Sequence, residues 1–184
     1  QQRLLVGDFP RHKDPLGELH SSGRRMAFLR FDSAPLPASI WVARATLQLW
    51  VRKLHRPGTL DVFAVGEAWT ENELSGDPLP ALGARVGSVA IEEEDELRYV
   101  VVDVTQVVRD WLSGALPDHG LALLPGGDGS LRAEMDSKES VLTSHAAELV
   151  GRNPLQLVRN RGSIRRTGTQ PLRFTHSRVG QLGL

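Results

Sequence analysis

Apolar and polar residues alternate along most of the chain, in short runs that favour β-strands. The clearest run is Ala45-Thr-Leu-Gln-Leu-Trp-Val51, in which the apolar residues would face a core and Trp50 would lie on the outer side. In a second run, the side that carries Leu29 and Phe31 is expected to face the core. The same pattern predicts strands at residues 4–6, 26–32, 40–51, 60–65, 86–91, 97–104, 120–124, 131–139 and 148–150.

The pattern changes to a helical period at Thr105, which is expected to be the N-cap of a short helix near residues 106–113. Gly114 follows as a stop signal. One face of this helix is apolar and would cover an open end of the strands; it carries Val107, Val108, Trp111 and Leu112. Short strands, Gly/Pro turns and one helix predict an all-β fold, an antiparallel β-sandwich resembling a jelly roll.

Composition limits the class of protein. The chain has 184 residues, 40% hydrophobic and 24% charged, as expected for one soluble globular domain. It has no cysteine, which excludes disulfides and thiolate metal sites, and no apolar run long enough to span a bilayer. The chain begins at Gln1 without a basic and apolar leader, as expected for an exported protein whose signal peptide has been removed; a sequence trimmed at this point would look the same.

The net charge of zero hides two electrostatic parts. All 22 acidic residues lie at or before Glu148, whereas residues 151–184 carry seven arginines and no acid. The sequence therefore predicts a sandwich over residues 1–150 and a basic tail, or strand-donating extension, over residues 151–184.

A set of short motifs, in this order and spacing, resembles one family of extracellular β-sandwich modules. They are Ala27-Phe-Leu-Arg-Phe-Asp32, the Ala45-x-Leu-x-Leu49 strand, Ala68-Trp-Thr-Glu71, Asp103-Val-Thr105 with Trp111 after it, Gly120-Leu121 and Ser137-Lys-Glu139. The chain is similar over residues 4–150 to the DNRLRE-type domain, which is related to carbohydrate-binding module family 96 and to disaggregatase-associated domains. The resemblance implies a jelly-roll sandwich on bacterial secreted or cell-surface proteins, with polysaccharide binding in some members.

The chain departs from that family at both ends. Members usually begin with a strand before the segment matching Leu4-Leu-Val-Gly7, so the first strand of the sandwich is expected to be missing. The final strand could be either Ala146–Val150 or Pro154–Val158. A missing strand would leave an apolar groove with unpaired backbone groups. Another subunit could fill it by strand addition with Leu155–Val158 or Leu172–Thr175, giving a homo-oligomer through residues 151–184. The alternative is a flexible tail that is not part of the native protein.

Several charged and polar residues within or beside apolar strands are interpreted as structural, because an unpaired charge there would be costly. Arg30, Asp32, Asp103 and Glu139 are expected to form ion pairs that fix strand register, with a ligand site as the alternative, and Ser137 is expected to lie in a turn. Trp111 is expected in the core.

Exposed aromatic rings with polar neighbours are the usual means of binding sugars. The candidate ligand-binding residues are Trp50, Trp69, Tyr99, Arg44, Gln48 and Arg52, and Trp41 is a further aromatic candidate. The alternative for each ring is half-buried packing.

Other chemistry has weaker support. No nucleophile elbow, phosphate-binding loop or paired-histidine motif occurs, so we predict no catalytic residue, no metal site and no cofactor, although carboxylates for a glycosidase are plentiful. The acidic run at residues 92–96, read as a solvated turn, and Asp128 could bind Ca²⁺ weakly. The basic tail could contact nucleic acid, but it has almost no aromatic residues for stacking.

The sequence therefore predicts a non-catalytic module, secreted or on the bacterial cell surface, for structure or adhesion through polysaccharide binding. The alternative is a strand-exchanging structural subunit of a surface filament or envelope assembly, whose partner is a neighbouring protein subunit.

Overall fold

The computed structural model describes residues 3–8, 24–31, 42–70, 79–127, 129–136, 147–152, 157–160, 163–166 and 171–183. Its strands are β1 (Arg3–Asp8), β2 (Arg24–Phe31), β3 (Arg44–Arg56), β4 (Gly58–Val65), β5 (Leu82–Ile91), β6 (Arg98–Asp103), β7 (Leu121–Pro125), β8 (Arg132–Asp136), β9 (Glu148–Arg152), β10 (Leu157–Asn160), β11 (Ser163–Arg166) and β12 (Pro171–Gly183). One α-helix, α1 (Thr105–Ser113), and one 3₁₀ turn, η2 (Glu93–Asp95), complete the described elements.

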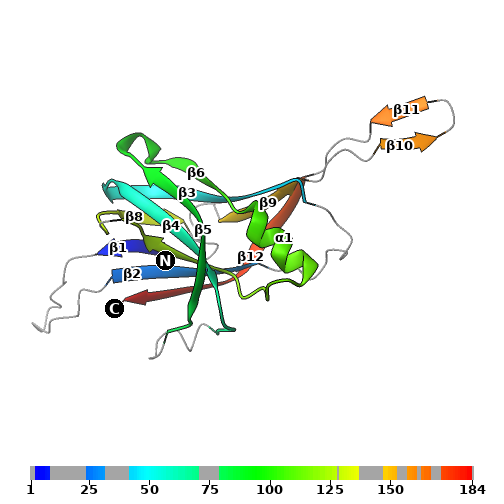
Figure 1. The fold of residues 1–184 in the computed structure, drawn as a ribbon. Coiled ribbons are helices and arrows are strands. Elements are labelled where there is room, and N and C mark those ends of the chain that lie inside the picture. Colours follow the sequence, from blue (N-terminus) through cyan, green and yellow to red (C-terminus); the bar gives the residue numbers. More distant parts are fainter. Residues whose placement is uncertain are drawn as a thin grey trace, which may run out of the picture.

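Ten antiparallel strands form one continuous hydrogen-bonded sheet that folds over on itself into two layers (Figure 1). In the β3 layer, β3 pairs with β6 along one edge and with β8 and β9 along the other. The β4 layer runs in the order β5, β4, β7, β2. β1 and β12 each pair with strands of both layers. This confirms the predicted all-β sandwich.

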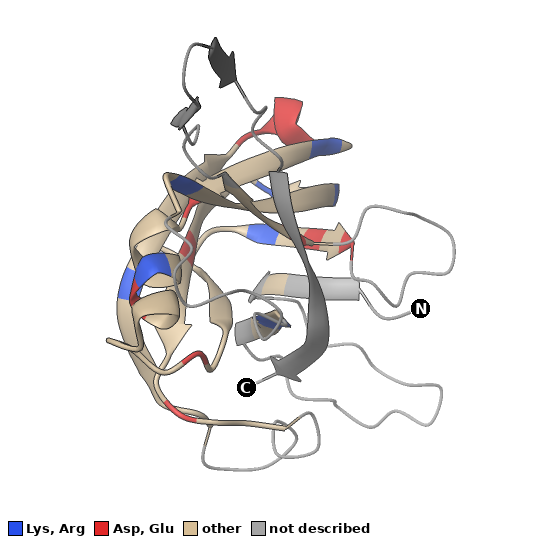
Figure 2. Ribbon diagram, turned by 90° about the vertical axis from the view of Figure 1, so that its right-hand side faces the viewer, with Lys and Arg blue, Asp and Glu red and all other residues tan. Residues whose placement is uncertain are grey.

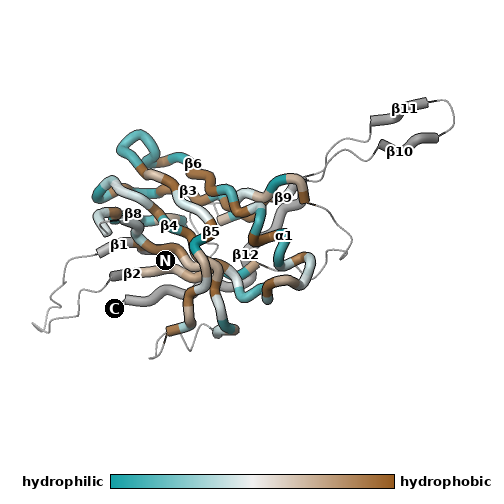
Figure 3. Tube along the Cα trace, in the orientation of Figure 1, coloured by the Kyte–Doolittle hydropathy of each residue, from teal (hydrophilic) through white to brown (hydrophobic). Residues whose placement is uncertain are grey.

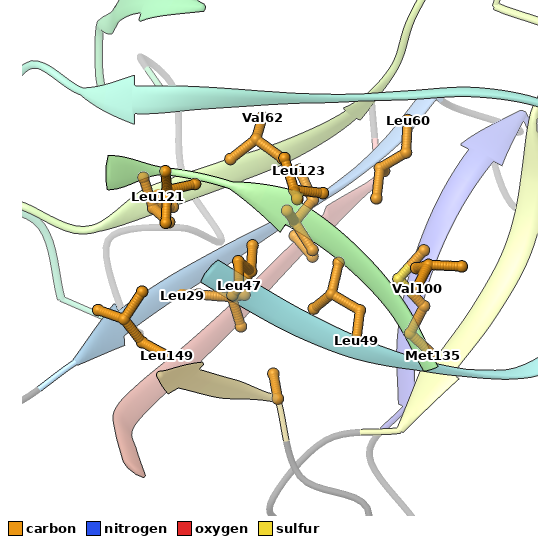
Figure 4. Close-up of a cluster of buried hydrophobic side chains, with 14 of the residues drawn as sticks. Leu29, Leu47, Leu49, Leu60, Val62, Val100, Leu121, Leu123, Met135 and Leu149 are labelled. Atoms are coloured by element: carbon orange, nitrogen blue, oxygen red, sulfur yellow. The ribbon is translucent and has the colours of Figure 1, made fainter. Parts of the chain in front are cut away.

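The core lies between the two layers and follows the predicted alternation along β3. Ala45, Leu47, Leu49 and Val51 are fully buried, whereas the residues between them are half-buried or exposed. Figure 3 shows this alternation as brown and pale segments along β3. Figure 4 shows Leu47 and Leu49 meeting side chains of the opposite layer, which include Leu29, Leu60, Val62, Leu121 and Leu123. Each such side chain contributes about 1.5–3 kcal/mol through burial.

A second apolar cluster covers the outer side of the β4 layer. Phe28, next to the core residue Leu29 in β2, points to this outer side and is nevertheless fully buried. Trp69, which follows β4, packs on it with ring centroids 5.6 Å apart, and Met26 lies in the same cluster. The prediction that Leu29 and Phe31 face the core is confirmed, but the other side of β2 is also buried.

Helix α1 lies where the change of period predicts it. Val107 and Val108 are buried, and Trp111 packs against the core from a half-buried position. The Arg109 side chain ties the helix to the start of β3, because its Nε and Nη2 donate to the carbonyl oxygens of Val42 and Ala43 at 2.8 and 2.9 Å. No helix in the described parts of the chain is both long and apolar enough to cross a bilayer.

The ends of α1 differ in how well the sequence predicts them. Gly114 is the C-cap in the left-handed conformation, with φ of 74°, as the stop signal predicts. The prediction that Thr105 is the N-cap is wrong: the N-cap is Val104, and no side chain caps it. Asp103 instead accepts the Thr105 backbone N–H at 3.0 Å, and the Thr105 hydroxyl oxygen accepts the N–H of Ala45 at 2.9 Å. The hydroxyl therefore connects the helix to β3.

The C-terminal segment belongs to the same sandwich. β12 pairs with β9 through residues 171–175 and with β2 through residues 176–183, so it lies between two strands of the family-like region. The predicted strand at Leu172–Thr175 is part of it. β10 and β11 pair only with each other, in a separate two-stranded hairpin that stands away from the sandwich in Figure 1. β9 itself continues across Gly151, where the charge composition changes.

The acidic run at residues 92–96 forms the turn between β5 and β6. η2 has a reciprocal capping box between Glu92 and Asp95, and it is the red turn at the top of Figure 2. Glu96 accepts the backbone N–H of Leu54 at 2.8 Å. Glu92, Asp95 and Glu96 therefore have structural partners, and the run is exposed except for the half-buried Asp95, as predicted for a solvated turn.

Candidate functional site

The outer side of the β3 layer gathers the candidate side chains. The register places Thr46 opposite Val150 of β9, Gln48 opposite Val101 of β6, and Trp50 opposite Tyr99 of β6. Since every second residue of β3 is buried in the core, the residues between them project outward together. We call this surface the β3 face; it consists of Arg44, Thr46, Gln48, Trp50, Tyr99, Val101 and Val150.

The β3 face is hollowed at its centre. A depression of about 200 Å³ is lined by Arg44, Thr46, Gln48, Val101 and Val150. It is smaller than the ~300–1,000 Å³ of enclosed ligand pockets, so it could hold only part of an extended ligand. The two valines give it apolar walls, and the polar side chains supply a guanidinium, a hydroxyl and an amide.

The polar groups of this hollow are available to a ligand. Within the described residues, the Thr46 hydroxyl and the Gln48 amide make no hydrogen bond to protein, and Arg44 uses only its Nε. A hydroxyl both donates and accepts, an amide offers both functions on separate atoms, and a guanidinium is a planar multiple donor. This set matches the hydroxyl and ring oxygens of a sugar.

An aromatic pair lies beside the hollow along β3 and β6. Trp50 and Tyr99 meet edge to face, with centroids 5.0 Å apart and an interplanar angle of 73°. Tyr99 is 39% exposed, and its neighbour Val101 on the same side of β6 is 47% exposed. Because the rings are nearly perpendicular, they form an angled wall rather than one flat platform.

The position of Arg44 is set by Asp103 at the end of β6. The Asp103 Oδ2 accepts from Arg44 Nε at 3.3 Å, and its Oδ1 accepts from the Thr105 hydroxyl at 2.6 Å. The hydrogen bonds from Thr105, followed by the charge of Arg44, lower the pKa of Asp103 below its usual 3.8. The carboxylate is therefore ionised at neutral pH and holds one side of the guanidinium, while both side chains remain more than half exposed.

Of the predicted ligand residues, the structure brings Arg44, Gln48, Trp50 and Tyr99 together on the β3 face. Arg52 follows Trp50 in β3, but its Nη1 lies 3.5 Å from Oδ1 of the buried Asp136, so it serves an ion pair between β3 and β8. The prediction that Trp69 is an exposed platform is wrong. Its ring is 2% exposed, and its Nε1 donates to the carbonyl oxygen of His119 at 2.8 Å.

Three residues of the hollow were not among the candidates. Thr46 shares the outward side of β3 with Gln48 and could have been included from the alternation alone. Val101 and Val150 come from other strands, and the sequence carries no signal for which strands neighbour β3. The aliphatic walls of the hollow were therefore not predictable.

Some predicted residues lie outside this site. Asp32, Trp41, Asp128, Ser137 and Glu139 fall outside the described residues. Arg30 is half-buried in β2, in register with Arg178 of β12. Among the described side chains, no three His, Asp or Glu gather as a metal site would require.

A two-layer antiparallel sandwich with an open, aromatic-bearing outer face has the architecture of a binding module. The chain belongs to carbohydrate-binding module family 96, whose model matches residues 10–150, from before β2 into β9. No curated protein matches the chain. The match confirms the predicted resemblance to carbohydrate-binding module family 96, and β1 and β12 lie outside the matched region.

Proposed function

We propose that the β3 face binds a polysaccharide and that Trp50, Tyr99, Arg44 and Gln48 carry the binding. The observation that supports this most directly is the hollow in which the side chains of Thr46 and Gln48 have no protein partner among the described residues. Apolar walls and unpaired polar groups lie next to the exposed Tyr99 and the half-buried Trp50. They meet both needs of sugar recognition, which are contact with the sugar ring faces and orientation of the hydroxyls.

The dimensions of the face favour a chain of sugars over a single one. Side chains two residues apart on one side of a strand are about 6.8 Å apart, so the distance from Arg44 to Trp50 is roughly 20 Å. The hollow lies near the Arg44 end of this line, and the Trp50–Tyr99 pair lies at the other end. The ligand would therefore lie along β3 and cross the hollow.

The module would act without catalysis, on a secreted or cell-surface bacterial protein, in adhesion or matrix structure. Family membership supports the binding role. The carboxylate beside the hollow, Asp103, accepts hydrogen bonds from Arg44 and Thr105. These contacts suit it for positioning the Arg44 guanidinium rather than for transferring a proton to a sugar.

Calorimetric titration tests the proposal with two sets of soluble polysaccharides, one neutral (xylan, galactomannan) and one anionic (polygalacturonate, heparin). We expect one set to bind, and Trp50→Ala to weaken that binding about tenfold through loss of ring contact. Gln48→Ala should weaken it several-fold through loss of one hydrogen bond.

Leu82→Ala is the matched control, because Leu82 is 37% exposed on β5, in the other layer. This variant should bind as the unmodified protein does. An equal loss of affinity in the Leu82 and Trp50 variants, or no binding to any of the polysaccharides, would contradict the proposal.

A further inference from the structure

The strand β12 occupies a slot that the rest of the sandwich leaves open. It forms five register pairs with β9, from Pro171↔Arg152 to Thr175↔Glu148, and seven with β2, from His176↔Phe31 to Gly183↔Arg25. Without β12, the edges of β2 and β9 would have unpaired backbone groups beside the apolar core. The region matched by the family model ends at residue 150, so this strand comes from outside it.

The sequence of β12 fits this slot on both sides of a bulge. Phe174 is in register with Leu149 of β9 and Val179 with Leu29 of β2, and both partners are core residues. Phe174 and Val179 are five positions apart, which in a regular strand would place them on opposite faces. The register shift between His176 and Arg178 inserts one extra residue into β12. Phe174 and Val179 therefore both stand opposite core residues. The spacing of apolar residues in β12 therefore fits its register with both β9 and β2.

The described strands in the connection from β9 to β12 do not pair with the sandwich. Residues 153–170 separate β12 from β9, and the described strands in this stretch, β10 and β11, pair only with each other. Figure 1 shows the hairpin projecting away from the sandwich. About 18 residues can span up to ~60 Å when extended, which is enough to reach a neighbouring molecule.

We propose that β12 is an exchangeable strand, and that the slot between β2 and β9 takes β12 of a second copy of this chain to form a reciprocal dimer. Each strand makes the same register pairs in either arrangement, so exchange changes only the path of residues 153–170. The partner is a second copy because the bulge and its flanking apolar positions are matched to this slot.

The balance between the two forms depends on concentration. A connection of about 18 residues gives β12 an effective concentration in the millimolar range for its own slot. The monomer therefore prevails when micromolar protein refolds, whereas refolding near millimolar concentration gives exchanged dimers. These persist after dilution for as long as the sandwich stays folded.

Cysteine cross-linking in the full chain tests the proposal, because the chain has no cysteine of its own. Two single variants are used, Glu148→Cys in β9 and Thr175→Cys in β12, because these two residues are opposite each other in the β9–β12 pairing. The two proteins are mixed, unfolded, refolded together at ~1 mM or ~5 μM and oxidised, and covalent heterodimers are counted by mass spectrometry. We expect heterodimer after concentrated refolding and at least tenfold less after dilute refolding.

Arg178→Cys replaces Thr175→Cys in the control mixture, because residue 178 is in register with Arg30 of β2 and too far from residue 148 for a disulfide. The double variant Glu148→Cys/Thr175→Cys, oxidised as a dilute monomer, should lose the ability to exchange. The pair Arg30→Cys and Arg178→Cys repeats the test at β2, should either β9 variant fail to refold. Absence of heterodimer in folded mixtures at both registers, or equal cross-linking in the control mixture, would overturn the proposal.

Discussion

Two tryptophans show how position, rather than residue type, determines a role. Trp50 lies on the β3 face, whereas Trp69 is buried in the cluster on the outer side of the β4 layer and packs on Phe28. In the local sequence, both tryptophans are aromatic residues among polar neighbours, so the sequence around them does not distinguish the two. Only the packing of distant residues decides which ring meets solvent, so the same substitution should have different consequences at the two sites.

Trp69→Ala should lower the free energy of unfolding by about 3–5 kcal/mol, because it opens a cavity against Phe28 and leaves the His119 carbonyl without its donor. Urea denaturation followed by circular dichroism measures this difference. Trp50→Ala, in a half-buried position, should cost much less. Similar midpoints for the Trp69 variant and the unmodified protein would mean that Trp69 is not part of a packed cluster.

Asp103→Asn tests the carboxylate that positions Arg44. Because the pKa of Asp103 is lower in the folded than in the unfolded state, its ionisation stabilises the protein above pH ~4, and this contribution is lost as the pH falls through the lowered folded-state pKa. The variant should therefore be less stable than the unmodified protein at pH 7, and the difference should shrink towards pH 2. Thermal unfolding across this range provides the measurement; a difference that does not vary with pH would contradict the assignment.

At the scale of elements, the edge strand β5 of one layer approaches the edge strand β6 of the other layer at Gly87. A Cβ at Gly87 of β5 would lie 2.4 Å from Cγ1 of Val102 in β6 and 3.1 Å from the Asp103 carbonyl oxygen. β5 and β6 can therefore approach only where this side chain is absent. Among the described strands, both are terminal in their layers, and each pairs with a single strand.

Gly87→Ala should destabilise the sandwich by about 1–3 kcal/mol through overpacking between β5 and β6. Ser88→Ala, one residue further along β5 and exposed, is the matched control and should change stability little. Differential scanning calorimetry of the two variants makes the comparison. If the Gly87 variant melts with the control, the layers are not in contact at this point.

An element could be predicted from the sequence where the spacing of its own apolar residues determines which side chains are buried. The alternation in β3 and the apolar face of α1 depend on the spacing of residues within each element, so their buried residues were predicted correctly. The cap of α1 was not, because Thr105 has a competing partner in Ala45, which is 60 residues away in sequence. In the same way, β3 extends beyond its predicted end at Val51, because β8 pairs with residues 51–56.

At the scale of the whole molecule, half of the candidate site could be predicted. Arg44, Gln48, Trp50 and the opposing Tyr99 were identified because β3 alternates and β6 is a clear strand. The valine walls, the burial of Trp69 and the engagement of Arg52 by Asp136 all depend on which strands are neighbours. The sequence did identify residues 172–175 as a strand, and the structure gives that strand a slot within its own chain.

The location of β12 also determines when the sandwich can close between β2 and β9. Its slot lies between β9 and β2, and β2 was synthesised roughly 150 residues earlier. A nascent chain that has not yet reached residue 171 holds most of the described strands but cannot join β2 to β9. The two layers therefore close along this edge only after β12 has been made.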